Sequence, residues 1–505
     1  MTARRIGLIL GPLALALTAL LPPPAGLAPM GWLVAGLVVW MAAWWMTEAV
    51  PLTVTALLPF VVLPLARVSN AETTASTYYS PILFLLLGGA FIALAIERTG
   101  LHRRLSLAIL RAVGARGSAD RLLLAFMIAA ALLSMFISNT STALIMMPMA
   151  LAVLEGGTLP GSGAIGQQAS PSSRAAIGQK VPPSSSEAPP PSSSEAVGQQ
   201  EGIAGALPMG IAFAASIGGL GTIVGSPTNA ISVGLLDEIA GVRITFAQWS
   251  IYGIPVVLLS IPLAAFIIAR VQKIAAYPFD LDAARTAIDS HAPWSGPERR
   301  LVPLVLATFL AWVTQPLVAP LLPPGSWTDG TIAVIAALAL FLLPDGTGRP
   351  LLVWREAERA PWSVIFMFGG GLALAAGMQA SGLAEWVGRA LLPLEAWPLI
   401  LVALAVVALV ILVTEFASNV ATATGIIPVV AALVVALGVD PVLLALPAAL
   451  AASWGFMLPA GTGPNAIAWS TGRIRIERMV TAGALLDLAG VFLIVGVVWG
   501  IAALV

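Results

Sequence analysis

Two short polar segments interrupt apolar stretches of the chain and lie 280 residues apart. They read FISNTSTALIMMP (residues 136–148) and FASNVATATGIIP (residues 416–428), and the same shift aligns Ser134 with Thr414. A helix that begins at such a break has unpaired backbone N–H groups that suit an anion, whereas a helix that ends there offers carbonyl oxygens to a cation. Hydroxyl and amide oxygens add further cation ligands. The two segments therefore predict sites for both kinds of ion.

A second pair of related motifs lies further along the chain. GTIVGSPTNAI (residues 221–231) aligns with MLPAGTGPNAI (residues 457–467) at a shift of 236. In each motif glycine permits unusual backbone conformations, proline leaves a carbonyl group without its helical partner, and asparagine supplies an amide. We expect the four broken elements to converge as two cation cages of hydroxyl, amide and carbonyl oxygen, with an anion between them.

The composition indicates the medium in which these elements lie. Hydrophobic residues make up 59% of the chain and charged residues 10%, and apolar runs long enough to cross a bilayer recur throughout. This predicts an all-α polytopic membrane protein with about 11 transmembrane helices. The chain has no cysteine, and we expect His102 and His291 in cytoplasmic loops. No nucleophile with a base and no intramembrane metal site can be assembled, so we do not expect an enzyme.

The arginines and lysines predict the orientation, because short cytoplasmic loops are enriched in them. When loops are assigned alternately from a cytoplasmic N-terminus, only Arg67, Arg243 and Arg389 of the 24 basic residues fall outside. This assignment predicts a cytoplasmic N-terminus and an outside C-terminus in a bacterial inner membrane. It also requires residues 122–154 and 399–438 to enter and leave on the same face, as two re-entrant hairpins.

The orientation turns the internal similarity into an inverted repeat. A shift of 281 aligns Gly88-Gly89 with Gly369-Gly370, and the segment containing the first pair runs inward where the second runs outward. Inverted repeats with discontinuous helices are the architecture of secondary transporters. The predicted units begin with N-terminal scaffold helices in 1–80. A first inverted repeat follows in 81–240, with hairpin 122–154, a flexible cytoplasmic loop 155–201 and a broken helix 205–240. Scaffold helices and a cytoplasmic linker occupy 250–360. A second inverted repeat occupies 361–474, with hairpin 399–438 and a broken helix 442–470, and a last transmembrane helix occupies 479–505.

The charges within the apolar segments bear on coupling. No arginine or lysine lies deep in such a segment, so an anion bound at the midplane needs its positive charge from elsewhere. Cotransported cations would supply it. Glu48 and Glu415 are the main membrane acids expected, which is a poor basis for a proton relay.

Three features together resemble one known family. WWMTEAVPLTVTALLP (residues 44–59), the two Ser-Asn tips and the Pro-Thr-Asn-Ala and Gly-Pro-Asn-Ala motifs look like the divalent anion/sodium symporters, which carry dicarboxylates, citrate and sulfate. The resemblance extends from about residue 30 to the C-terminus, except for the segment 155–201. It implies an elevator-type carrier whose scaffold forms a homodimer, with sodium as the cotransported ion and no nucleic-acid partner.

The resemblance also implies site residues. Those for the substrate carboxylates are Ser138, Asn139, Thr140, Ser226, Pro227, Ser418, Asn419, Val420, Thr462 and Gly463. Those for a first sodium ion are Ser134, Ser138, Asn139 and Gly225, and those for a second are Thr414, Ala417, Asn419 and Gly461, with the alanine and glycine acting through backbone carbonyls.

The chain departs from the family pattern at two places. Val420 stands where threonine is common, which removes a hydroxyl from the substrate cavity, and the motifs read Pro-Thr-Asn and Gly-Pro-Asn where Pro-Pro-Asn is common. The reading favoured by the sequence is a sodium-coupled importer of succinate, malate or fumarate. A sodium-independent dicarboxylate exchanger and a sodium-coupled citrate or sulfate carrier on the same fold remain open.

Overall fold

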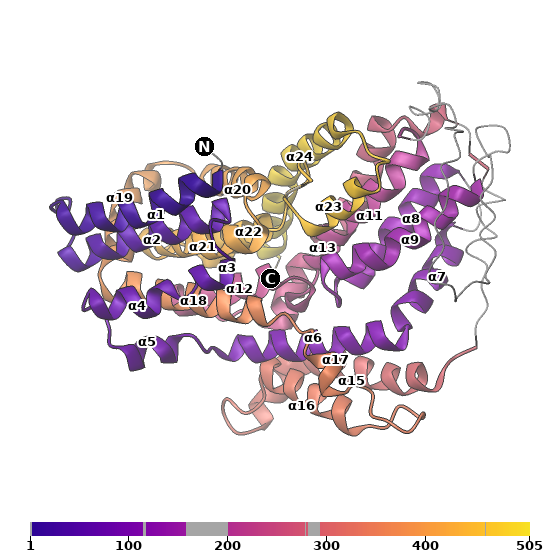
Figure 1. Ribbon diagram of the computed structural model, residues 1–505, viewed down its shortest axis with the longest axis horizontal. Coiled ribbons are helices and arrows are strands. Elements are labelled where there is room, and N and C mark those ends of the chain that lie inside the picture. The colour runs from indigo at the N-terminus through magenta and orange to yellow at the C-terminus, as the bar shows by residue number, and fades with distance from the viewer. Residues whose placement is uncertain are drawn as a thin grey trace, which may run out of the picture.

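A computed structural model describes residues 3–114, 118–157, 200–277, 279–280, 293–459 and 461–504. Within these residues the regular structure is helical, and the one pairing of β type is an isolated bridge between Pro344 and Pro350. The all-α prediction is confirmed (Figure 1). Most of the predicted loop 155–201 and His291 lie outside the described residues.

The helices fall into four consecutive groups. The first group is α1 (Ala3–Leu20), α2 (Pro29–Thr47), α3 (Leu52–Thr55), α4 (Leu58–Leu65) and α5 (Ala71–Thr77). A first series follows: α6 (Pro81–Thr99), α7 (Leu101–Gly114), α8 (Ala119–Ser134), α9 (Asn139–Gly157), α11 (Ile203–Gly219), the short η1 (Ile223–Gly225), α12 (Pro227–Ala240) and α13 (Phe246–Val271). Next come α15 (Gly296–Val318), α16 (Asp329–Leu342) and α17 (Trp354–Ala357). The second series is α18 (Trp362–Ala380), α19 (Leu383–Leu391), α20 (Leu399–Phe416), α21 (Asn419–Leu437), α22 (Pro441–Ala451), α23 (Gly463–Ser470) and α24 (Ile476–Ala502).

The two series have the same order of elements. Each begins with a long apolar helix and a shorter helix, continues with a helix pair joined by four or fewer residues, and ends with an interrupted helix and a long helix. Figure 1 shows the pair α8–α9 and the pair α20–α21 in opposite halves of the molecule, with α13 and α24 between them. The inversion of one series relative to the other across a membrane stays a prediction.

The lengths of the described helices agree with a polytopic chain. Nine are long and apolar enough to cross a membrane: α1, α2, α6, α13, α15 with its continuation to Leu321, α18, α20, α21 and α24. Four shorter apolar stretches, 52–65, 203–219, 329–342 and 441–451, fall within the remaining predicted spans. The arginine pattern places α20 and α21 in one hairpin, so the other seven long helices and the four shorter stretches together correspond to the predicted eleven spans. The number of spans stays a prediction.

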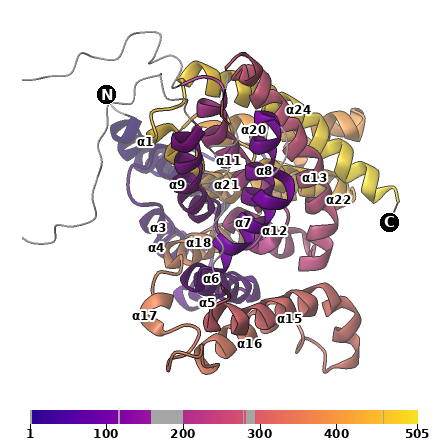
Figure 2. The same cartoon turned by 90° about the vertical axis from the view of Figure 1, so that its right-hand side faces the viewer.

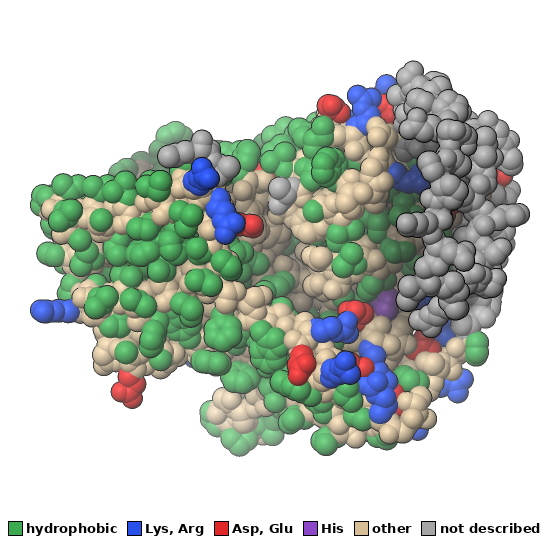
Figure 3. All heavy atoms as spheres, in the orientation of Figure 1, with side chains coloured by type: hydrophobic (Ala, Val, Ile, Leu, Met, Phe, Trp, Pro, Cys, Tyr) green, Lys and Arg blue, Asp and Glu red, His purple; other side chains and the backbone are tan. Residues whose placement is uncertain are grey.

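The surface has the character of a membrane protein. Hydrophobic side chains cover most of the face in Figure 3, and charged side chains gather toward one end. Large apolar side chains with more than half of their area exposed include Leu258 on α13, Leu310 on α15 and Phe492 on α24. Exposed apolar area of this extent fits contact with lipid.

The interrupted helices connect the two series. α11 packs against α8 and α9, and α22 packs against α20 and α21, so each first half lies beside its own helix pair. Each second half packs against the helix pair of the other series: α12 packs against α21, and α23 packs against α9. The four helices whose starts the sequence singled out thus pack in two pairs, α12 with α21 and α23 with α9, and each pair joins the two series.

The long first helices of the two series join this centre to the outer helices. α6 packs along α16, where a Cβ on Gly88 would collide with the backbone of Ala333. α18 packs against α3, α4 and α5, where a Cβ on Gly370 would collide with the backbone of Ala56. Figure 2 shows α15 and α16 at one edge of the molecule and α24 toward the opposite edge.

Candidate ion and substrate site

Tip one is the connection between α8 and α9, taken here as residues 134–142. The Ser138 hydroxyl accepts a hydrogen bond from the backbone N–H of Ser141 (3.2 Å). The backbone carbonyl of Ser138 accepts one from the N–H of Thr142 (2.9 Å). Serine is a favoured helix cap because its side chain satisfies an N–H that the helix cannot. The first turn of α9 therefore starts abruptly after a polar break, with its remaining N–H groups at the tip.

Oxygen atoms from three elements cluster around the side chain of Asn139. One terminal atom of its amide lies 2.8 Å from Ser134 Oγ and 3.2 Å from the carbonyl oxygens of Ala215 and Gly225. With its NH₂ group turned inward, the amide donates to these oxygens. With its oxygen turned inward, four oxygens face one another, and a cation between them would remove their repulsion. The cluster is thus suited to a small cation.

Buried side chains hold the shape of break one, residues 220–226, through hydrogen bonds. The amide nitrogen of Asn229 donates to the carbonyl oxygens of Gly219 (2.7 Å) and Thr222 (2.8 Å), and the Thr222 hydroxyl donates to the carbonyl of Met135 in tip one (2.5 Å). Trp249 of α13 donates to the carbonyl of Leu220 (2.8 Å). These bonds satisfy carbonyls that the interrupted helix leaves unpaired.

Tip two, residues 414–422, repeats the first arrangement at the predicted shift of 280. Ser418 caps α21 by accepting from the N–H of Ala421 (3.2 Å). Thr414 Oγ1 lies 2.9 Å from Asn419 Oδ1 and 2.9 Å from the carbonyl oxygen of Ala452. A hydroxyl has a single hydrogen and cannot donate to both acceptors at once. Three oxygens again lie close together, at the position related to the first cluster.

In break two, the described residues of 452–462, an asparagine side chain again binds backbone carbonyls, at the predicted shift of 236. The Asn465 amide nitrogen donates to the carbonyls of Gly455 (3.5 Å) and Leu458 (3.2 Å), the counterparts of Gly219 and Thr222. The nitrogens of Asn229 and Asn465 thus hold the two breaks in shape, and in the described part of the chain the oxygen of each amide is buried without a hydrogen-bond partner.

Burial separates the predicted residues into two classes. Ser134, Gly225, Thr414, Ala417 and Gly461, all predicted cation ligands, are buried. Most predicted substrate residues are exposed or half-buried: Ser138, Asn139, Thr140, Pro227, Ser418, Asn419, Val420 and Gly463, whereas Ser226 and Thr462 are buried. The arrangement places enclosed oxygen clusters behind a more open polar surface.

The tips contact the helices of the opposite series. Thr140 lies so close to Gly463 that a Cβ there would collide with the threonine hydroxyl. α21, which begins at tip two, packs against α12, which begins after Ser226. Among the hydrogen bonds of the described residues, none joins Ser138 directly to Ser418. The two tips are thus connected through α12 and α23.

Two acidic residues correct the expectation for the membrane acids. Glu48, expected as one of the two main ones, is an exposed residue that ends α2 in a left-handed conformation with φ of 46°. Asp487 in α24 was missed, and it is buried close to Glu415. It stands alone in the apolar run that follows Met479, and no sequence neighbour marks its partner.

Comparison with known proteins decides the family. The model for the sodium:sulfate symporter transmembrane region matches residues 3–505. The chain belongs to this family of divalent anion:sodium symporters. The symporter family consists of membrane transporters, so the chain is a multi-pass transporter and not an enzyme.

Curated members of the symporter family are similar over nearly the whole chain. The sodium-dependent dicarboxylate transporter SdcS of Staphylococcus saprophyticus is 37% identical, covering 98% of this chain and 90% of that protein. SdcS of Staphylococcus aureus (strain MRSA252) is 36% identical, covering 100% and 92%. Among solved structures, the YdaH transporter of Alcanivorax borkumensis matches with a TM-score of 0.52 at 14% identity, covering 89% of this chain and 98% of that one, which is a likeness of fold alone.

Proposed function

We propose that the protein is a sodium-coupled importer of four-carbon dicarboxylates such as succinate, malate or fumarate. The observation that carries the proposal is the pair of buried oxygen clusters at Ser134/Asn139 and Thr414/Asn419, each directly behind a helix start that faces a more open polar surface. The relatives at 36–37% identity are named sodium-dependent dicarboxylate transporters, which favours this substrate class over citrate or sulfate.

In the proposed site each cluster holds one sodium ion. The first ion binds Ser134, Ser138, Asn139 and Gly225, and the second binds Thr414, Ala417, Asn419 and Gly461. These ligands are neutral oxygens, which suit a monovalent hard cation. Because the apolar segments contain no basic residue at this depth, the sodium ions also supply the positive charge that a dianion needs in a low-dielectric environment.

The dicarboxylate binds at the helix starts. α9 and α21 begin at the two tips, and α12 and α23 begin at the two breaks. Each start presents backbone N–H groups and the positive end of the helix dipole to an anion. Hydroxyls of Ser138, Thr140 and Ser418, with Ser226 and Thr462 at the breaks, donate further hydrogen bonds. Asn139 and Asn419 face both a sodium ion and the substrate, and this couples the two.

A cavity gives this site a route toward one face. It measures about 150 Å³ and is lined by Ser138 of tip one, Pro227 at the start of α12, Gly89 of α6 and Arg359. Arg359 belongs to the loop before α18, which the arginine pattern places in the cytoplasm. The cavity therefore fits a carrier open toward the inside.

The proposed transport cycle moves the two helix pairs and the interrupted helices together against a scaffold. The scaffold consists of α1–α5 and α15–α17 and forms a homodimer. Gly88 and Gly370 lie where α6 and α18 cross scaffold helices, so the sliding surfaces contain small residues. The chain lies in a bacterial inner membrane with its N-terminus in the cytoplasm and its C-terminus outside.

The test is uptake of labelled succinate into proteoliposomes under an inward sodium gradient and then under an equal potassium gradient. We expect accumulation with sodium only, blocked by unlabelled malate and fumarate but not by citrate or sulfate. Equal uptake with both cations would replace the symporter by an exchanger. Sodium-driven uptake of citrate or sulfate without succinate would change the substrate.

A further inference from the structure

Two buried acids lie together beside break two. Glu415 is 1% exposed and is the last but one residue of α20, and Asp487 is 6% exposed and lies in the middle of α24. The Glu415 carboxylate accepts hydrogen bonds from three consecutive backbone N–H groups, those of Phe456, Met457 (3.0 Å) and Leu458 (3.1 Å). Three backbone donors thus hold this carboxylate in place.

Asp487 has no comparable support. Both of its carboxyl oxygens are buried and have no hydrogen-bond partner in the described part of the chain. The charged group next to it is Glu415. Two carboxylates in contact in an apolar interior cannot both keep their charge without compensation. The pair therefore requires one positive charge between or beside its members.

On the described elements packed against α24, the positive charges lie at helix ends. α13, α20 and α22 are the helices packed most closely against α24. α13 contributes Tyr252 and Arg270, but Arg270 lies exposed in the last turn and stacks on Phe266. α20 contributes Glu415 itself, and α22 and break two contain no ionisable residue. On α24, the exposed Glu477 and the half-buried Arg478 lie in the first turn, where Arg478 pairs with Glu201 (3.0 Å).

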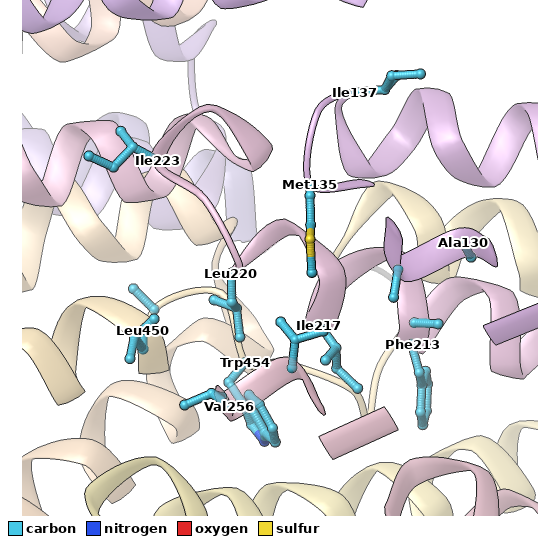
Figure 4. Close-up of a cluster of buried hydrophobic side chains, with 14 of the residues drawn as sticks. Ala130, Met135, Ile137, Phe213, Ile217, Leu220, Ile223, Val256, Leu450 and Trp454 are labelled. Carbon is cyan, nitrogen blue, oxygen red and sulfur yellow. The ribbon is translucent and has the colours of Figure 1, made fainter. Parts of the chain in front are cut away.

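The first series builds the same tip without an acid. At the shift of 280, Met135 occupies the position of Glu415. Figure 4 shows Met135 pointing from tip one toward Ile217 and Leu220 within a buried apolar cluster. Break one is therefore covered by a methionine where break two is covered by a carboxylate.

The residue that faces this position on the following long helix also differs between the two series, being apolar in the first and acidic in the second. Gly253 of α13 lies against the backbone of break one, and Gly483 of α24 lies against the backbone of break two. Four residues after these glycines come Val257 and Asp487, both buried. The apolar pair shows that this architecture folds without acids, so the acidic pair serves a purpose other than building the break.

We propose that Glu415 and Asp487 bind one sodium ion in addition to the two oxygen clusters. This inference rests on the proposed function. Two sodium ions balance the charge of a dianion. A third positive charge carried with them makes each transport cycle move one net positive charge inward, so membrane voltage drives uptake.

The test compares wild type with Asp487→Asn in proteoliposomes, measuring the charge moved per succinate from the reversal potential of uptake. The asparagine amide donates to Glu415 without a bound cation. We expect about one net charge per succinate in wild type and about zero in Asp487→Asn, with sodium-driven uptake retained in both. Asp487→Val, which introduces the residue found at Val257, is the second variant. Glu477→Gln is the control, because it removes a carboxylate from the exposed first turn of the same helix and should leave the charge unchanged.

Varying the sodium gradient and the pH gradient separately tests the ion. The reversal potential of wild type should follow the sodium gradient more steeply than that of Asp487→Asn, and a wild-type potential that follows the pH gradient instead overturns the sodium site. Equal charge movement in wild type and both variants overturns the inference. A measurement independent of transport uses thermal unfolding of the purified proteins in detergent. Wild type should be stabilised more steeply than Asp487→Asn by added sodium, and identical dependences also overturn the inference. Absence of any succinate uptake by wild type, in contrast, contradicts the proposed function.

Discussion

Thr414 Oγ1 lies 2.9 Å from Asn419 Oδ1, five residues along the chain and across the end of one helix and the start of the next. In the first series Ser134 Oγ lies 2.8 Å from a terminal atom of the Asn139 amide, across the same kind of junction. A hydroxyl on the last turn of one helix thus meets an amide on the first turn of the next, twice in one chain. Each asparagine stands between a buried oxygen cluster and the open face of the tip.

The first prediction concerns these two amides. Asn139→Ala and Asn419→Ala should each reduce sodium-driven succinate uptake to background, because each amide contributes to a cation site and to the substrate site. Elution of the variants at the wild-type position in size-exclusion chromatography should show that folding is intact. Asn70→Ala is the matched control, since Asn70 caps α5 at an exposed position (2.7 Å to the N–H of Thr73). Near-normal uptake by either tip variant would contradict the site.

The second prediction tests the contact between tip one and α23. Gly463→Ala adds a methyl group that collides with the Thr140 hydroxyl, so tip and helix start must separate. We expect the KM for succinate to rise about tenfold or more, since a buried polar group left without its hydrogen bond costs about 1–3 kcal/mol. Gly425→Ala is the control, because a Cβ there meets no atom within 4 Å. An unchanged KM in Gly463→Ala would remove this contact from the substrate site.

Much of the local geometry could be predicted from the sequence because it depends on residues close in the chain. The shift of 280 that aligns Ser134 with Thr414 also aligns the two capping serines and both hydroxyl–amide contacts. The shift of 236 that relates the Asn-Ala motifs reappears in the pairs of carbonyls that Asn229 and Asn465 bind. Side chains a few residues apart at a helix end have few alternative partners, so identical motifs give identical bonds.

The cross-pairing of the two series could not be predicted in this way. The apolar periodicity of the sequence does not indicate that α12 packs against α21 or that α23 packs against α9. The same limit applies to Glu415 and Asp487, which lie 72 residues apart in sequence and meet only because break two folds over the end of α20. A lone acid in an apolar run does not reveal which distant group it faces.

The third prediction concerns the departure at Val420. This half-buried residue lies in the first turn of α21, and its carbonyl accepts from the Thr424 hydroxyl (2.7 Å). Val420→Thr keeps the volume and adds a donor beside Asn419. The KM for succinate should fall about three- to tenfold, the range expected for one added hydrogen bond. Val435→Thr places the same hydroxyl on an exposed part of the same helix and should change nothing. A higher KM in Val420→Thr would indicate a pocket shaped for a different anion.

The last prediction concerns an ion pair at the end of α6, outside the spans. Asp345 is fully buried and pairs with Arg98, which also donates to the carbonyl of Leu351 (2.6 Å). Burial alone would raise the pKa of Asp345, but hydrogen bonds from Arg98 and Thr347 outweigh it and hold the pKa below its usual range. A carboxyl whose folded pKa is lowered stabilises the folded state above the pKa of the unfolded chain, about 3.9, and this stabilisation is lost as pH falls through the folded value.

Asp345→Asn should therefore lower the free energy of unfolding at pH 7 by about 3 kcal/mol, because it removes the buried carboxylate and leaves Arg98 only its longer ion pair with Glu356 (3.5 Å). The loss should be the same at pH 5, where the carboxylate is ionised in both folded and unfolded chains, and it should shrink below about pH 3.9. Thermal unfolding in detergent measures the difference. Glu385→Gln, which breaks an exposed pair with Arg389 on α19, should change stability by less than about 0.5 kcal/mol. A loss in Asp345→Asn that diminishes already between pH 7 and pH 5 would show that the carboxylate is not held by Arg98 in solution.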